Sequence, residues 1–484
     1  MEKDTSLIGR FYVTTPIYYV NDKPHIGHAY STIAADVLAR WRFKQGEDVT
    51  FSTGVDENSQ KTVEAAAKNK EEIHAYIDRM AKIWESTWQK LGISNTDFVR
   101  TTEDRHVATV NDLWRRMEAA GDLYKGTYEG FYCTACETFY KEGDLTPDGL
   151  CPVHKTKPEW VSERNYYFAL SKYQKPLLDF YEAHDDFVAP ANRFKEVKSF
   201  VERGLEDVSF SREKKSWGIP VPDDPEQIIY VWADALVNYI TVIGGIEGWE
   251  QHPADIHMVG KDILRFHAVI WPAMLMSAGL PLPGQVVATG FFTVDGVKIS
   301  KSLGNAIDPL DLTARYGVDA LRYFLLREIP FGEDGDFSEA KMKERYNSDL
   351  ANGLGNFAAR ILALAEKEEL KSVSLDPAFE LEIQKMQQAV FAKTKEFRFH
   401  EALSAIWAAI AFGDKYLNDR AVWAIKDRGE RREKLFNLVS LLDNVAAVLS
   451  PYLPETSRKI TASIQWENDV LRAERIEPLF PRIS

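Results

Sequence analysis

The chain has 484 residues, 45% of them hydrophobic, and a formal net charge of −14. This length predicts about two to four domains, and the apolar content is sufficient for their cores. The acidic balance argues against general binding of polyanions, so contact with a nucleic acid must be confined to one face. Met1–Ser6 contains no apolar signal core and Pro272 breaks the most apolar run, Ala268–Leu282. We therefore expect a cytoplasmic protein that does not contact a membrane.

The first predicted elements are a strand and an amphipathic helix. Phe11–Thr15 is β-branched and aromatic, as in a buried strand. Apolar residues then recur at helical spacing between Ile33 and Trp41. His25 and His28 lie at the start of this helix, where backbone N–H groups and the helix dipole favour anions. The pattern predicts a phosphate site, and the alternative is that the two histidines merely cap the helix.

Further strands along the chain predict two halves of one parallel sheet. A second strand at Asp48–Thr53 is followed, much later, by Ile228–Val231, Ile256–Val259 and Val286–Thr289. An aromatic insert with all three cysteines separates the halves, and from about Ser338 the pattern is helical. The fold class is therefore α/β, a parallel-sheet domain split by an insert and followed by a helical bundle. The predicted segments are 1–121 and 223–290 for the sheet, 122–222 for the insert, 291–345 for a loop and linker, and 346–484 for the bundle.

A lysine-containing loop follows the second half of the sheet. Gly296–Gly304 holds Lys298 and Lys301 three residues apart, with hydroxyl residues between and after them. Lysine is a mobile point charge suited to phosphate, and glycines at both ends allow a loop to close over a ligand. Taken alone, a solvated surface loop explains this stretch equally well.

Together these motifs resemble those of a known enzyme family. His25-Ile-Gly-His28 and Lys298-Ile-Ser-Lys-Ser302 are similar to the HIGH and KMSKS signatures of class I aminoacyl-tRNA synthetases. Other stretches, in order along nearly the whole chain, resemble the methionyl-tRNA synthetase family. They are Thr14–Tyr19, Val55–Glu57, Tyr230–Leu236, Val259–Asp262, Phe266–Pro272 and Asn347–Asn356.

The resemblance implies an architecture and a reaction. The sheet domain would be a Rossmann-type catalytic domain, the insert a zinc-binding connective domain, and the bundle an anticodon-binding domain. The implied reaction activates L-methionine with ATP, bound as its Mg²⁺ complex, to methionyl-adenylate and pyrophosphate, and then transfers methionine to initiator and elongator tRNA(Met). Because the chain stops soon after the bundle, we expect a monomer.

The resemblance also assigns residues to the ATP site. His25, His28, Lys298 and Lys301 would be catalytic, since displacement at phosphorus needs positioning and charge neutralisation more than a nucleophile. Asp262 would meet the ribose, and a helix N-cap is a second reading that is compatible with the first. The full ATP set is His25, Gly27, His28, Gly260, Asp262, Ile299 and Lys301.

A second implied set would bind methionine. Aromatic rings suit a polarizable thioether, and Asp56 would hold the ammonium group. Without the resemblance the apolar members would be read as core. Asp56-Glu-Asn-Ser59 departs from the Asp-Glu-His-Gly common in the family, which puts the neighbouring loop in question rather than Asp56. The set is Ile17, Tyr19, Asp56, Trp232, Ala235, Leu236, Tyr239, His267 and Ile270.

The cysteines of the insert predict a metal site. Cys133 and Cys136 form one closely spaced pair, and Cys151 and His154 form another. Four such ligands make a closed tetrahedral zinc site with a structural role. The alternative is a metal-free insert with reduced thiols.

The helical segment carries an expected tRNA contact. Asn356 and Arg360 are four residues apart and share one helix face. The resemblance places them near Trp423, which would stack on an anticodon base while the pair reads its neighbours. Three nearby arginines would contact phosphates, and they are Arg428, Arg431 and Arg432. The alternative for Trp423 is a core position in the bundle.

Other functions agree less well with these residues. Class I enzymes for valine, isoleucine and leucine carry a much larger editing insert than 122–222, and a cysteine enzyme would place a catalytic zinc on the main sheet. Small nucleotidylyltransferases lack a helical bundle of this length. A non-catalytic tRNA-binding paralogue would lack one of the two signatures, and both are present.

Overall fold

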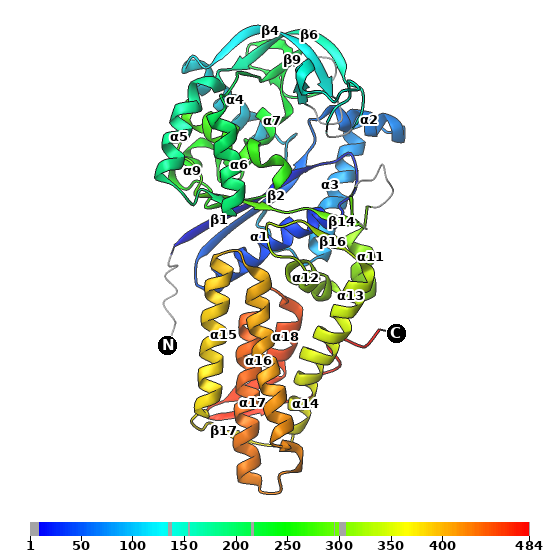
Figure 1. Ribbon diagram of the computed structural model, residues 1–484, viewed down its shortest axis with the longest axis vertical. Helices are drawn as coiled ribbons and strands as arrows, with labels where there is room; N and C mark the ends of the chain where they lie inside the picture. The colour runs from blue at the N-terminus through cyan, green and yellow to red at the C-terminus, as the bar shows by residue number, and fades with distance from the viewer. Residues whose placement is uncertain are drawn as a thin grey trace. The chain divides into compact units, whose positions relative to one another are not determined.

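The structure, a computed structural model, describes residues 9–133, 138–152, 155–213, 217–294, 296–299 and 306–483, without the side chains of 138, 139, 297 and 298. The described chain forms two units (Figure 1). The first unit contains residues up to Pro24 together with Arg42–Thr289, and the second contains His25–Trp41 with residues from Gly290 onward.

A six-stranded sheet forms the centre of the first unit. Its order is β3-β2-β1-β12-β13-β7, and every neighbouring pair is parallel. Strands buried on both faces need nearly continuous apolar runs, which explains why β1 and β12 could be predicted. The strand bounds are β1 Arg10–Tyr19, β2 Asp48–Asp56, β3 Asp97–Arg100, β7 Val188–Ala189, β12 Ile256–Gly260 and β13 Gln285–Thr289.

One predicted strand lies in a different sheet. The segment Ile228–Val231 was expected in the parallel sheet, but β11 (Asp224–Ile229) pairs antiparallel with β9 (Ser211–Glu213) and β10 (Pro220–Val221). Two residues connect β10 to β11, and the second of them, Asp223, has a φ of 62°. A two-residue turn with positive φ closes a hairpin, so the nearest partner of β11 is antiparallel.

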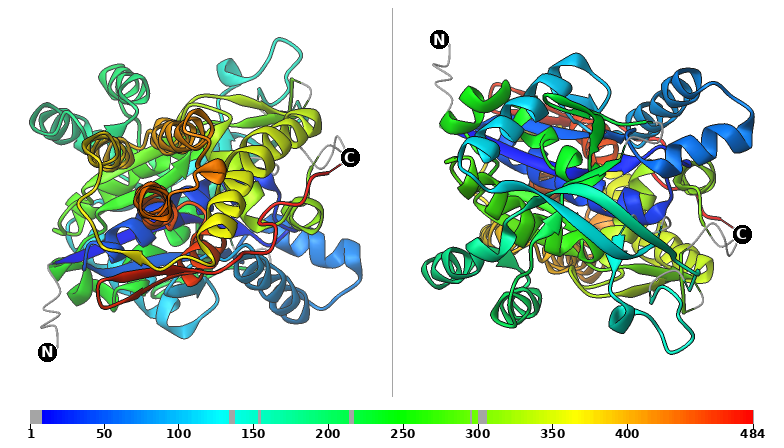
Figure 2. Two further views of the ribbon diagram at one scale, coloured as in Figure 1. Left: turned by 90° about the horizontal axis from the view of Figure 1, so that it is seen from below. Right: turned by 90° about the horizontal axis from the view of Figure 1, so that it is seen from above.

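The range expected as an insert contributes strands to all three sheets of the first unit, β9 and β10 among them. Strand β7 lies within 122–222, yet Val188 pairs with Val286 at the edge of the main sheet. The rest of this range includes an antiparallel sheet of order β5-β4-β6-β8, in which the long β4–β6 pair is the cyan ribbon in the right view of Figure 2. Its strands are β4 Leu123–Cys133, β5 Thr138–Tyr140, β6 Glu159–Phe168 and β8 Val208–Ser209.

Helices of the first unit supply a tryptophan-rich core. Trp84, Trp114, Trp249 and Trp271 are at most 1% exposed. The helices are α2 Gln60–Asn69, α3 Ile73–Lys90, α4 Asp104–Ala119, α5 Gln174–Ala183, α6 Ala191–Glu202, α7 Val231–Ala235, α8 Asn238–Val242, α9 Gly245–Gln251 and α10 Trp271–Ser277. A short 3-10 turn, η3 (Lys261–Ile263), and a π-helical segment, η4 (Phe266–Ile270), directly precede α10.

The second unit is mainly helical, as predicted. Helices α15, α16 and α17 pack against one another in sequence, and α18 packs against α17 (Figures 1 and 2). A three-stranded sheet of β17 (Leu370–Lys371), β18 (Ile464–Glu467) and β19 (Val470–Ala473) was not anticipated. The helices are α11 Pro309–Tyr316, α12 Val318–Arg327, α13 Glu339–Arg345, α14 Asn356–Ala365, α15 Pro377–Lys395, α16 Phe399–Asp419, α17 Arg428–Leu449 and α18 Pro454–Ala462.

Helix α1 (Ile26–Lys44) joins the second unit through a buried ion pair. Arg322 of α12 and Asp36 of α1 are fully buried, and Arg322 Nη2 lies 2.6 Å from Asp36 Oδ2. Arg322 also donates to the backbone carbonyls of Pro451 and Tyr452. Since a buried charge is stable only when paired and hydrogen-bonded, this contact fixes the helix that begins with the histidine motif.

In the part of the chain that the structure describes, no helix combines the length and apolarity needed to cross a membrane.

Candidate active site

The two histidines of the first motif cap helix α1 with their rings. Nδ1 of His25 accepts from the backbone N–H of Gly27 at 3.1 Å, and Nδ1 of His28 accepts from the N–H of His25 at 3.2 Å. The carbonyl of His25 accepts from the N–H of Ala29, as the residue before a helix does. The rings stack with centroids 3.7 Å apart. The two histidines therefore do cap the helix, and the same hydrogen bonds fix where each ring carries its proton, so capping does not exclude a role in phosphate binding.

Capping determines where each imidazole carries its proton. Nδ1 can accept from a backbone N–H only when it is unprotonated, so a neutral ring carries its proton on Nε2. Both His25 and His28 then have Nε2–H donors at a helix N-terminus, where anions are favoured. The arrangement suits phosphate oxygens without requiring a charged histidine.

Gly27 is required by the same geometry. A Cβ on Gly27 would lie 2.9 Å from Cε1 of His25, closer than such atoms approach. The ring of His25 can fold over the first turn only because position 27 has no side chain. The glycine between the two histidines is thus explained by the cap.

The lysine loop is described only at its start. Strand β14 (Phe292–Val294) pairs with β15 (Val297–Lys298), so that Thr293 is opposite Lys298. Ile299, predicted to contact ATP, is buried. Lys301 lies outside the described residues, as does the side chain of Lys298.

Gly260 and Asp262 follow the central strand β12. Gly260 pairs with Thr289 at the carboxyl end of the sheet, where α/β proteins bind their ligands. A Cβ on Gly260 would lie 2.7 Å from Asp262 Oδ1, so the glycine makes room for this carboxylate. Gly260 is the residue before the 3-10 turn, and the N-cap alternative for Asp262 is therefore wrong. Asp262 is exposed and thus accessible to a ribose.

Asp56 ends strand β2 at the same edge. It is 4% exposed and pairs with Tyr19 in the β1–β2 ladder. The loop that departs from the family pattern is well anchored, because Asn58 Nδ2 donates to Asp234 Oδ2 at 3.0 Å. Ser59 Oγ accepts from the N–H of Thr62 and caps α2. The loop after Asp56 is therefore tied to α7, the helix that carries Trp232.

The first unit brings several predicted methionine residues together. Trp232 stacks on Phe266 with ring centroids 3.9 Å apart. The rings of Trp232 and Tyr19 are in a T-shaped arrangement with centroids 6.4 Å apart. Ala235 and Leu236, at the end of α7, are buried. Ile17 is half-buried in β1, and Ile270, also half-buried, ends η4. The result is an aromatic and aliphatic surface near the carboxyl ends of β1 and β2.

Tyr239 and His267 form a buried polar pair beside this surface. The Tyr239 hydroxyl lies 2.6 Å from Nε2 of His267, and Nδ1 of His267 lies 3.0 Å from the carbonyl of Ile263. Burial lowers the pKa of His267 to about 4 and raises that of Tyr239 above its usual value. Both side chains are therefore neutral at physiological pH.

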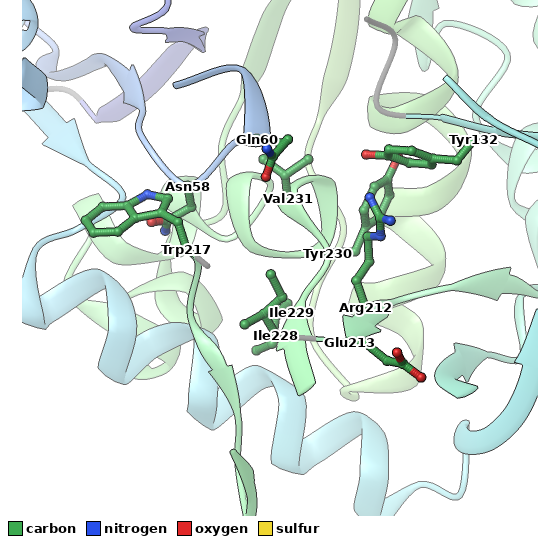
Figure 3. A pocket seen from close by; sticks show the side chains of 10 residues that line it. All are labelled: Asn58, Gln60, Tyr132, Arg212, Glu213, Trp217, Ile228, Ile229, Tyr230 and Val231. Carbon is green, nitrogen blue, oxygen red and sulfur yellow. The ribbon is translucent and has the colours of Figure 1, made fainter. Parts of the chain in front are cut away.

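A small pocket of about 50 Å³, partly open to solvent, is lined by residues that are neighbours of Asp56 and Trp232 in the sequence (Figure 3). Asn58 is two residues after Asp56, and Val231 directly precedes Trp232. Its wall combines aromatic rings, two amides and a guanidinium, a lining suited to a planar polar group. The lining residues are Asn58, Gln60, Tyr132, Arg212, Glu213, Trp217, Ile228, Ile229, Tyr230 and Val231.

Two of the four predicted zinc ligands are described, and both are buried. Cys133 pairs with Thr138 across β4 and β5, and the N–H of Cys151 donates to the carbonyl of Thr156. In both cases the partner of the cysteine is the fifth residue after it, Thr138 for Cys133 and Thr156 for Cys151. Sγ of Cys133 lies 3.5 Å from Oγ1 of Thr156, and Sγ of Cys151 lies 3.7 Å from the hydroxyl of Tyr140. The Cys133 thiol therefore contacts the loop of Cys151, and the Cys151 thiol contacts β5, the strand that pairs with the strand of Cys133.

The other two predicted ligands, Cys136 and His154, lie outside the described residues. Among the described residues no group of three histidines, cysteines or carboxylates could hold a metal ion. That absence does not bear on a site that includes Cys136 and His154. The donor set and the facing loops fit a structural zinc ion.

The residues predicted to read the anticodon are close together in the second unit. Arg360 lies over the ring of Trp423 at 5.6 Å and donates to Asp414 and Asn418. Asn356, one turn earlier on α14, is exposed. Trp423 is 49% exposed while its neighbour Val422 is fully buried, so the core alternative for Trp423 is wrong. It is Val422 that packs into the bundle.

The arginines expected to contact phosphates surround a carboxylate. Arg432 Nε lies 2.9 Å from Glu368, and Arg428 and Arg431 lie within 4.0 Å of it. The negative charge of Glu368 offsets only part of the charge of the three arginines. The cluster keeps a net positive charge of two.

Several residues of the site were not predicted from the sequence. Phe266 supports Trp232, and Asn58 links the loop after β2 to Asp234. Oγ1 of Thr14 lies 2.7 Å from Nδ1 of His257 inside the sheet. A histidine within the apolar strand Ile256–Gly260 was a signal that could have identified this last pair, since buried polar groups need partners.

Comparison with known proteins decides the family. A family model described as class I tRNA synthetases (M) matches residues 11–156 and 143–362. The methionine–tRNA ligase of Thermotoga maritima is 45% identical over 95% of this chain and 76% of its own length, and that of Synechocystis sp. is 41% identical over 97% and 93%. The chain belongs to the methionine–tRNA ligase family.

Solved structures agree with this membership. Mycobacterium tuberculosis methionyl-tRNA synthetase in complex with methionyl-adenylate is 38% identical, has a TM-score of 0.93, and is matched over 98% of this chain and 100% of that one. The parallel-sheet α/β core predicted from the sequence is therefore the class I fold of the methionine–tRNA ligase family. Members are enzymes, and the prediction of a class I aminoacyl-tRNA synthetase is confirmed.

Proposed function

We propose that this chain activates L-methionine with ATP and then transfers it to tRNA(Met), with the residues predicted from the sequence in the roles given below. The observation that carries the proposal is the similarity of nearly the whole chain to methionine–tRNA ligases and to a structure that holds methionyl-adenylate. The carboxyl ends of β1, β2 and β12 carry Tyr19, Asp56 and Gly260, three of the residues that have a role in this proposal.

Methionine binds through its two ends in this proposal. The carboxylate of Asp56 holds the α-ammonium group, because the two opposite charges attract each other more strongly where little water screens them. The side chain lies against Tyr19, Trp232 and the hydroxyl-bearing ring of Tyr239. Aromatic rings contact a thioether favourably, so the Trp232–Phe266 stack supports selection of methionine.

ATP binds with its ribose near Gly260 and Asp262. Its phosphates receive hydrogen bonds from Nε2–H of His25 and His28, and ATP enters as its Mg²⁺ complex, in which the ion neutralises phosphate charge. Lys298 and Lys301 supply positive charge from the loop. A carboxylate oxygen of methionine attacks the α-phosphorus as the bond to the bridging oxygen breaks, and pyrophosphate leaves with that electron pair. Positioning and charge neutralisation supply the catalysis.

The insert holds one structural zinc ion in this proposal. Cys133, Cys136, Cys151 and His154 are the ligands, and a bound ion would cross-link the two loops. The buried thiols of Cys133 and Cys151 on facing loops support this assignment. Its role is to order the insert, with no position open for chemistry.

The second unit recognises the anticodon loop of tRNA(Met). Unstacked bases are bound by aromatic stacking and by hydrogen bonds to their edges. Half of the Trp423 ring is exposed, with the guanidinium of Arg360 beside it and Asn356 one turn away. Because initiator and elongator tRNA(Met) share their anticodon, one such site serves both.

ATP–pyrophosphate exchange with each of the twenty amino acids tests the activation step. The proposal predicts rapid exchange with methionine and exchange near background with the others. Faster exchange with isoleucine, valine, leucine or cysteine would assign the chain to another class I specificity. No exchange with any amino acid, from folded protein that binds tRNA, would favour a non-catalytic role.

A further inference from the structure

The proposed methionine site combines residues from two segments of the first unit. Asp56, the last residue of β2, would hold the ammonium group, and Trp232 of α7 would contact the side chain. Asn58 follows Asp56 by two residues and lines the same pocket as Val231, the neighbour of Trp232 (Figure 3). The distance between Asp56 and Trp232 therefore depends on what joins this loop to α7.

Asp234 of α7 joins the two segments. Oδ2 of Asp234 accepts from Nδ2 of Asn58 at 3.0 Å, and Nδ2 also donates to the carbonyl of Thr101 at 3.1 Å. The amide group has two protons, so it can make both hydrogen bonds at once. Thr101 directly follows β3, the edge strand that pairs with β2. The loop after β2 is thus held to α7 and to the end of β3 through one side chain.

His106 of α4 binds the other oxygen of Asp234. Nε2 of His106 lies 3.0 Å from Oδ1 of Asp234, and because a carboxylate can only accept, Nε2 carries a proton. Nδ1 of the same ring lies 3.0 Å from Oγ1 of Thr241, a residue of α8. The ring is therefore held at both nitrogens. One set of hydrogen bonds connects α4, α7, α8 and the loop that carries Asn58.

These hydrogen bonds are shielded from water. Asp234 and His106 are fully buried, and Asn58 is only 9% exposed. A hydrogen bond to a charged group is stronger in such surroundings, and a buried carboxylate oxygen without a donor is costly. The loop cannot move away from α7 without leaving Oδ2 of Asp234 unpaired. The hydrogen bonds of Asp234 therefore resist any change in the distance between Asp56 and Trp232.

We propose that Asp234 is a positioning residue that sets the spacing between the two parts of the methionine site, with Asn58 and His106 as its partners. This inference rests on the proposed roles of Asp56 and Trp232. A ligand that reaches both residues gains from a preset spacing, because no protein segment has to be ordered when it binds. A ligand that reaches only one of them gains nothing. The spacing therefore favours the whole amino acid over its separate parts.

Asn58→Leu tests the positioning role, because leucine keeps the size of the side chain and removes its donor. The Kd of methionine, measured by calorimetry, should rise about tenfold, the effect of losing a hydrogen bond to a charged group. The second probe is methyl propyl sulfide, which is methionine without its ammonium and carboxylate groups. It cannot bind Asp56, so its Kd, measured by ligand-observed NMR, should not change. General damage to the pocket would weaken both ligands equally.

Variants that keep a hydrogen bond should keep methionine binding. In Asn58→His an imidazole N–H can donate to Asp234, so the Kd of methionine should return close to the wild-type value. In Asp234→Asn one amide oxygen still accepts from Asn58, and the amide can donate to Nε2 of His106 once that ring carries its proton on Nδ1. Asp234→Leu removes both acceptors and should weaken methionine at least as much as Asn58→Leu.

Asp122→Leu is the matched control for Asp234→Leu. Asp122 is a buried carboxylate of the first unit and accepts from Ser277 at 2.8 Å and from Lys172 at 2.7 Å. None of these three residues has a role in the proposed site. Both leucine variants leave buried donors unpaired, so both melting temperatures should fall, but the Kd of methionine should rise only in Asp234→Leu.

The two levels of the proposal fail in different ways. Folded Asn58→Leu that binds methionine as tightly as wild-type protein, or that loses methionine and methyl propyl sulfide equally, would overturn the positioning role. Equal weakening of methionine in Asn58→Leu and Asn58→His would overturn it as well, because the donor would then not matter. Folded wild-type protein without methionine-dependent ATP–pyrophosphate exchange would instead overturn the proposed function itself.

Discussion

Single residues at the start of α1 serve structure and chemistry at once. His25 and His28 each accept a backbone N–H at Nδ1, and this hydrogen bond places the ring proton on Nε2. A residue that caps a helix is usually a short polar side chain. The use of two imidazoles is explained if their Nε2–H groups meet phosphate oxygens during the reaction.

Replacement of His28 separates these two roles. His28→Ala should lower methionine-dependent exchange by on the order of 100-fold, because a preorganised donor to the transition state is lost. Methionine affinity, measured by calorimetry, should stay the same, and loss of the cap should cost about 1 kcal/mol of stability. His184→Ala is the control, since His184 is an exposed histidine of the first unit. Equal exchange rates in the two variants would exclude His28 from catalysis.

The buried His267 should make stability depend on pH. Its pKa is about 4 in the folded protein and near 6.5 when unfolded, so between these values the unfolded state binds more protons. The free energy of unfolding therefore falls as pH drops below about 6.5, by about 2 kcal/mol at pH 5. Denaturant unfolding at pH 7 and pH 5 measures this change in the free energy of unfolding. The change should be smaller in His267→Gln than in the wild-type protein, by about the amount that His267 contributes. The same difference in both proteins would mean that His267 does not carry this effect.

At the scale of elements, the insert depends on its two loops. Cys133→Ser should remove the single zinc ion predicted per chain and disorder the loops around it, because metal binding and folding are coupled in such sites. Elemental analysis of protein purified without added metal measures the zinc, and hydrogen exchange of residues 138–152 measures the order. Wild-type protein that lacks zinc yet has full activity would contradict a structural metal.

The short 3-10 turn that carries Trp423 should act in tRNA binding alone. Trp423→Ala should lower tRNA(Met) affinity by about 1–3 kcal/mol, the usual contribution of one base–aromatic stack, and leave pyrophosphate exchange intact. Trp466 is a matched control, since it belongs to the same unit and is 48% exposed, compared with 49% for Trp423. If both alanine variants bind tRNA equally well, Trp423 does not stack on a base.

Elements with strong local patterns could be predicted, and those fixed by distant partners could not. Strand β1 and helix α1 follow from apolar runs and spacing alone. The parallel position of β7 depends on pairing between Val188 and Val286, 98 residues apart in the sequence, and two residues give no pattern. The site residues came from motifs, whereas the buried pair of Thr14 and His257 depends on a tertiary contact between single polar residues and could not be found that way.

On the scale of the whole molecule, an acidic chain must bind an acidic partner. The net charge of −14 repels tRNA at long range, so binding relies on local groups such as the arginines around Glu368. Affinity for tRNA should therefore fall with salt. All residues assigned to methionine, ATP and the anticodon belong to one chain, so no second copy is required, and light scattering should give a monomer of 55.1 kDa. A stable dimer would contradict that expectation.

The most direct test of the whole account follows the α-phosphate of ATP. Wild-type protein mixed with ATP labelled at that phosphate and with methionine should form labelled methionyl-adenylate. Addition of tRNA(Met) should then release labelled AMP as methionyl-tRNA appears in equal amount. Failure to form the adenylate with methionine, or an adenylate that tRNA(Met) does not consume, would contradict the account.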